Sequence, residues 1–86
     1  MTEAERAAVD VAASYYAKHT GKKLRPEQRD KLLEVMQNGI AATHVMDAVD
    51  AAISRHGLCG TERDYWETVL KECRKTWLKL YGKAAP

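Results

Sequence analysis

The residues best suited to metal chemistry are His56, Cys59 and Cys73, which could meet near a Leu-Cys-Gly turn. Zinc prefers four nitrogen and sulfur ligands, which usually come in paired clusters such as Cys-x-x-Cys. Here the pattern is His-x-x-Cys and then a single cysteine, with His44 as a distant fourth ligand. Cys73 is better explained as a small core residue. The sequence therefore predicts no metal or other cofactor, and two free thiols in a reducing compartment.

Nucleophilic catalysis is the next chemistry that the sequence could support. Cys59 follows His56 closely, but no residue pattern marks an oxyanion site or a pocket around a reactive thiol. The carboxylates are explained as helix-start charges and as surface pairs such as Glu27 with Lys31. Every glycine is isolated, so there is no glycine-rich phosphate loop. We expect a protein that is not an enzyme.

Charge is the more informative feature, although the whole chain carries only +2. Residues 18–31 hold six basic and two acidic side chains, and residues 71–83 hold five and one. Each stretch therefore carries +4, which leaves the remainder acidic. Such a dipolar surface can steer a polyanion to one side of a protein. The alternative interpretation is a set of solvated helix faces.

Nucleic-acid binding needs cations for the phosphates and an exposed aromatic ring for base stacking. The last helical segment offers a lysine face opposite its apolar arc, with a tyrosine at the boundary, and the loop KHTGKKLR adds further lysines. We expect the two tryptophans, Trp66 and Trp77, in the core, because both fall on the apolar arc. The candidate nucleic-acid contacts are Tyr65, Lys71, Arg74, Lys75, Lys79, Lys22 and Lys23.

The elements that must position these residues are all helical. The sequence predicts an all-α fold, a compact single domain over 1–86 with four helices at about 3–19, 26–38, 42–56 and 62–81. Capping-box spacing, a first-turn proline and regularly placed glycines mark the helix ends. The predicted apolar positions are Ala8, Val11, Ala12, Tyr15 and Tyr16 in the first helix, and Trp66, Val69, Leu70, Cys73, Trp77, Leu80 and Tyr81 in the last.

Length and hydropathy narrow the class of protein further. A chain of 86 residues has room for one modest core. No apolar run approaches the ~20 residues that span a bilayer. The opening MTEAERAAVD lacks the apolar region of a secretory signal, so we expect a cytoplasmic protein.

The order of these features resembles the DnaD-like replication-primosome domain, in its C-terminal helical module. The segment YYAKHTGKKLRPEQRDKLLEVMQNG resembles that module's tyrosine-bearing helix, basic loop and leucine-rich helix, and HVMDAVDAAISRHG resembles its third helix. The family's Y-x-x-x-I-x-x-x-W motif is matched at Tyr65 and Val69. Cys73 stands in place of the tryptophan, and Trp77 lies one turn later.

The resemblance implies a helical module that binds DNA, single-stranded DNA included, without strong sequence preference and contacts replication proteins. The winged-helix domain that commonly precedes this module does not precede it here, which suggests a phage or mobile-element protein. The alternative function is a small adaptor or inhibitor of the phage type, which binds a host protein and not DNA. Oligomeric state does not follow from the sequence.

Overall fold

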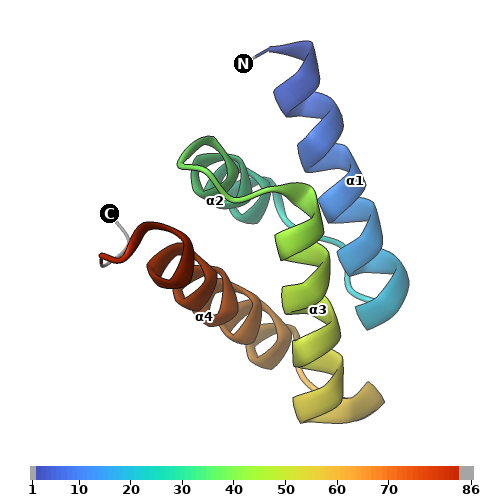
Figure 1. Cartoon of the computed structure of the whole chain (residues 1–86). Coiled ribbons are helices and arrows are strands. Elements are labelled where there is room, and N and C mark those ends of the chain that lie inside the picture. The colour runs from blue at the N-terminus through green and yellow to red at the C-terminus, as the bar shows by residue number, and fades with distance from the viewer. Residues whose placement is uncertain (1, 84–86) are drawn as a thin grey trace.

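The protein is a four-helix fold in a computed structural model that describes residues 2–83 (Figure 1). The helices are α1 (Glu3–Thr20), α2 (Pro26–Gln37), α3 (Ala42–His56) and α4 (Glu62–Tyr81), and a 3-10 turn, η1 (Gly57–Cys59), precedes α4. The predicted all-α architecture is confirmed, with helix ends displaced by one residue at most. Over residues 2–83 there is no strand, and no helix is both long and apolar enough to cross a lipid bilayer.

Local sequence explains where the helices begin and end. At the start of α1 the Thr2 hydroxyl accepts from the Glu5 amide at 3.1 Å, while the Glu5 carboxylate accepts from the Thr2 amide at 3.2 Å. Thr61 caps α4 in the same reciprocal way. α1 and α4 end at glycines with left-handed backbone, Gly21 (φ 72°) and Gly82 (φ 68°), a conformation that glycine adopts without steric cost.

Helix α3 lies at the centre of the packing. It packs closely against both α1 and α4, and α1 also packs against α2, whereas α2 and α4 are not a closely packed pair. In Figure 1, α1 and α3 lie side by side and run in the same direction, and α4 begins beside the lower half of α3 and runs away from it toward the C-terminus. The side chains that α3 buries are small, namely Val45, Ala48, Val49 and Ala52, which lets the helices approach one another closely.

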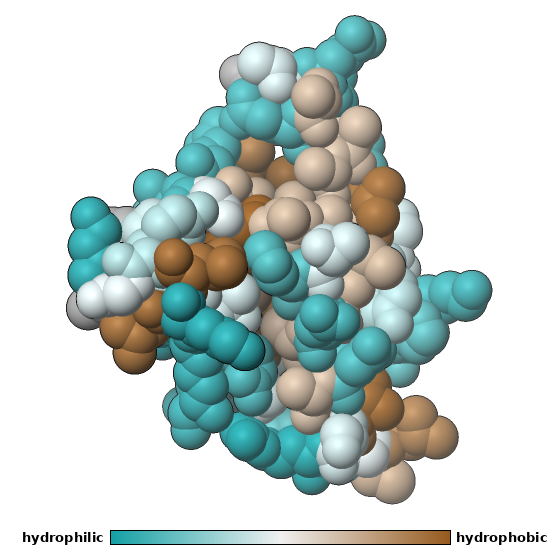
Figure 2. All heavy atoms as spheres, viewed as in Figure 1, coloured by the Kyte–Doolittle hydropathy of each residue, from teal (hydrophilic) through white to brown (hydrophobic). Residues whose placement is uncertain are grey.

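Three predicted core positions, Val11, Leu80 and Tyr81, are exposed. Val11 is 53% exposed, because the buried arc of α1 is centred on Val9 and Tyr16, and Val11 lies about 200° around the helix from Val9. Leu80 is 50% exposed, although its position continues the apolar arc of α4. The C-terminal end of α4 lies away from α3 in Figure 1, so α3 does not cover that turn. Figure 2 shows apolar side chains on the surface at this end and near η1.

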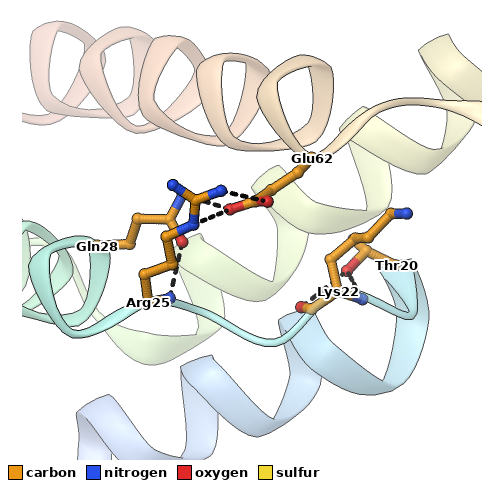
Figure 3. Close-up of polar contacts among 5 residues, drawn as sticks. All are labelled: Thr20, Lys22, Arg25, Gln28 and Glu62. Carbon is orange, nitrogen blue, oxygen red and sulfur yellow. Dashed lines mark hydrogen bonds and ion pairs between the residues drawn. The ribbon is translucent and has the colours of Figure 1, made fainter.

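Polar contacts tie α2 to α4 at both ends. The Arg25 guanidinium, just before α2, donates to both carboxylate oxygens of Glu62 at 3.0 and 3.1 Å, and the Gln28 amide adds a bond of 3.3 Å (Figure 3). At the other end the Tyr81 hydroxyl donates to the carbonyl oxygen of Gly39 at 3.0 Å. The two helices therefore begin near each other and end near each other.

Candidate nucleic-acid interface

Tyr65, the predicted stacking residue, is completely buried at the start of α4. Its hydroxyl donates to the carbonyl oxygen of Gly57 at 2.6 Å and accepts from the Gly60 amide at 3.1 Å. The ring also meets His56 edge-on, with centroids 6.3 Å apart. No face of the ring is open to a base, so the prediction that Tyr65 stacks on nucleic acid is wrong. Its role in the structure is to hold the turn between α3 and α4.

The sequence carried a signal for this role in Gly60. A Cβ atom at Gly60 would lie 2.8 Å from Tyr65 Cε1 and 2.9 Å from His56 Cβ. Such distances are shorter than carbon–carbon contact allows, so this glycine is needed for the close approach of the ring. In the sequence, the burial of Tyr65 was indicated only by a glycine five residues earlier, in the turn between two helices.

The C-terminal half of α4 displays the predicted cations on its surface. Lys71, Arg74, Lys75 and Lys79 are all exposed. Lys75 lies 3.8 Å from the carboxylate of Glu72, which Arg55 also approaches at 4.0 Å. Within residues 2–83, the other three cations form no ion pair. Their charge is therefore available to an anionic ligand.

The loop cations lie at a different place. Lys22 and Lys23 are exposed between α1 and α2. The Lys22 amide donates to the Thr20 hydroxyl at 3.1 Å, which fixes the loop backbone beside the Arg25–Glu62 pair (Figure 3). From Glu62 to Lys71 the helix rises by about 14 Å at 1.5 Å per residue. The fold thus places the two loop lysines apart from the predicted cations of α4.

The three candidate metal ligands are not gathered into one site. His56 Nε2 lies 2.8 Å from the Thr68 hydroxyl, and Cys59 is exposed in η1. Cys73 is buried on α4, and burial raises the pKa of its thiol to about 11. In the part of the chain that the structure describes, no three His, Cys, Asp or Glu side chains are placed to hold a metal ion.

A groove between α2 and α4 is the site that sequence patterns did not indicate. It is lined by Lys31, Glu34, Val35, Asn38, Ile40, Leu70, Cys73, Arg74 and Trp77. Leu70, Cys73 and Trp77 had been expected in the core. They line the groove because α2 and α4 are not closely packed. The Tyr81 ring lies against Trp77, with centroids 4.2 Å apart.

Comparisons with protein-family models, with curated proteins and with solved structures found no match for the chain. The resemblance to the DnaD-like domain stays a prediction from the sequence.

Proposed function

We propose that the protein is a non-enzymatic module that binds DNA without strong sequence preference through the C-terminal half of α4. The observation that carries the proposal is a set of exposed cations on one helix, of which Lys71, Arg74 and Lys79 have no carboxylate partner within residues 2–83. Phosphate contacts need only such available charge, and they carry no sequence information. Lys22 and Lys23 provide a second, separate point of contact.

The arrangement favours the phosphate backbone over the bases. Lys71, Lys75 and Lys79 are four residues apart, so they form one row with a rise of about 6 Å per step. With Tyr65 buried, the predicted contacts no longer include an aromatic ring for stacking. Binding should therefore be electrostatic, similar for duplex and single strands, and strongly dependent on salt.

The DnaD-like resemblance proposes a role for this activity in DNA replication. The same resemblance proposes a replication protein as a further partner. Both statements rest on the sequence motifs, and the exposed cations of α4 are consistent with them.

Salt-dependent binding to random-sequence DNA tests the proposal. With three to five phosphate contacts, the logarithm of the affinity should fall against the logarithm of salt concentration with a slope of roughly −3 to −4. Gln substitutions at Lys71, Arg74 and Lys79 should each flatten the slope by about one. Lys18→Gln is the matched control, because it removes one exposed charge of α1. Absence of binding at low salt, or equal effects of all four substitutions, would contradict the proposed interface.

Protein binding is a second candidate function, and a specific observation favours it. The end of α4 exposes three large apolar side chains, namely Leu78 (53% exposed), Leu80 (50%) and Tyr81 (47%). Phosphate contacts do not involve such side chains. Exposed apolar groups that adjoin a groove are typical of a surface for a protein partner. This candidate corresponds to an adaptor or inhibitor that binds a host protein.

A further inference from the structure

The groove between α2 and α4 is held open by the way these two helices are connected. Arg25 and Gln28 bind Glu62 where the helices begin, and Tyr81 binds the Gly39 carbonyl where they end. Between these contacts, α2 and α4 are not closely packed. The side chains between them therefore line a small groove that is partly open to solvent.

The floor of the groove is apolar. Val35, Leu70 and Trp77 are partly buried there, and Ile40 and Cys73 are buried beneath them. Trp77 Nε1 is buried and has no hydrogen-bond partner in the part of the chain that the structure describes. The ring is held by packing, including its contact with Tyr81, and not by a hydrogen bond.

The rim of the groove is charged in a way that selects the ligand. Lys31 lies 3.6 Å from Glu34, so these two charges largely offset each other. Arg74 has no such partner within residues 2–83 and leaves the rim with one available guanidinium. A guanidinium binds a carboxylate with two parallel hydrogen bonds. A ligand that fits both features therefore carries an acidic side chain next to the apolar side chain that enters the groove.

A nucleic-acid base fits this groove less well than a peptide does. Tyr81 already lies against the Trp77 ring at a centroid distance of 4.2 Å, so the ring is not a free stacking surface. An apolar side chain needs no stacking face, and a single carboxylate is enough to pair with Arg74.

We propose that the α2–α4 groove binds an acidic peptide segment of a partner protein, with an apolar side chain on Val35, Leu70 and Trp77 and a carboxylate on Arg74. The inference rests on the second candidate function, protein binding, and it is independent of DNA binding. Occupation would bring the partner beside the exposed apolar end of α4, where Leu78 and Leu80 lie.

Tryptophan fluorescence can follow occupation of the groove directly. Trp66→Phe leaves Trp77 as the only indole of the chain. In this background, a short synthetic peptide with leucines flanked by aspartates should change the fluorescence in a saturable manner. Versions of the peptide with Asn for Asp, or Ser for Leu, should bind more weakly. A random-sequence oligonucleotide is titrated in parallel.

Val35→Ser separates this groove from the DNA interface, whereas Arg74→Gln tests the charged rim, which both proposals share. Val35→Ser removes part of the apolar floor and should weaken peptide binding by roughly fivefold while DNA binding is unchanged. Arg74→Gln should weaken peptide binding by about two- to fivefold, as loss of an exposed ion pair does, and Lys18→Gln should not. Circular dichroism and thermal melting confirm that each variant is folded.

The inference is overturned if the acidic peptide causes no change up to millimolar concentration, or if Val35→Ser and Arg74→Gln leave its binding intact. It is also overturned if the oligonucleotide, and not the peptide, changes the Trp77 fluorescence in a saturable manner, because the groove then binds nucleic acid. Peptide binding without any DNA binding supports the groove and refutes the DNA proposal, so the two failures are distinguishable.

Discussion

Removing the hydroxyl of Tyr65 should destabilise the protein without touching any ligand site. Tyr65→Phe leaves the ring in place but deprives the Gly57 carbonyl of its donor and the Gly60 amide of its acceptor. Each hydrogen bond contributes about 0.5–1.5 kcal/mol, so the free energy of unfolding should fall by about 1–3 kcal/mol. For a domain of this size the melting temperature should fall by about 4–8 °C for each kcal/mol.

Chemical denaturation with circular dichroism measures this loss. Tyr15→Phe is the matched control, because it also removes one tyrosine hydroxyl, which donates to Asp50 at 2.7 Å on the surface. Asp50 is exposed and remains solvated after the change, so the control should lose less than about 0.5 kcal/mol. DNA affinity at low temperature, where both variants are folded, should stay at the parent value.

The opposite pattern would refute the assignment. If Tyr65→Phe were as stable as the parent, the hydroxyl would not hold the turn. If Tyr65→Ala remained folded at full stability and lost single-strand binding selectively, the ring would be an exposed stacking surface. A truncation of a fully buried aromatic residue instead costs about 3–5 kcal/mol, which would leave little of a small domain folded.

Three further predictions follow from buried groups. Gly60→Ala should destabilise the fold by about 1–3 kcal/mol in denaturant, because the new methyl group overlaps the Tyr65 ring, and unchanged stability would contradict the described turn. Cys59 should react with a thiol reagent at neutral pH, whereas Cys73 should react only on unfolding, because burial raises the pKa of its thiol to about 11. Equal reaction rates of the two thiols would refute the burial of Cys73. Burial, and secondly the charge of Glu62, raises the pKa of Tyr16 from 10.0 to about 12. Its neutral form stabilises the fold below pH 10.0, and this contribution is lost as pH rises from 10.0 to about 12, which alkaline melts and ultraviolet titration of the phenols should show.

Helix positions were predictable because their signals are local. The Thr2–Glu5 and Thr61–Asp64 spacings, Pro26 and the helix-ending glycines act within a few residues of the chain. A capping hydrogen bond depends on the backbone of the same turn, so it is independent of how the helices later pack. For this reason every helix was predicted to within one residue at each end.

The face that each helix buries was less predictable because it depends on its neighbours. Periodicity placed Val11 and Leu80 with the core, but α1 packs around Val9, and the last turn of α4 extends beyond the cover of α3. Tyr65 falls at the edge of the arc on a helical wheel. It is fully buried because η1 folds back over it and uses its hydroxyl.

The candidate site shows the same contrast between local signals and contacts made by distant residues. The sequence by itself determined a four-helix domain and the positions of its cations, because charge and helical spacing belong to single residues and single turns. Only the tertiary structure decided which cations remain available, since Arg25 and Arg29 pair with carboxylates of distant segments while Arg74 does not within residues 2–83. It also decided that α2 and α4 are joined at their ends with a groove between them, because such separations depend on contacts between residues far apart in the chain.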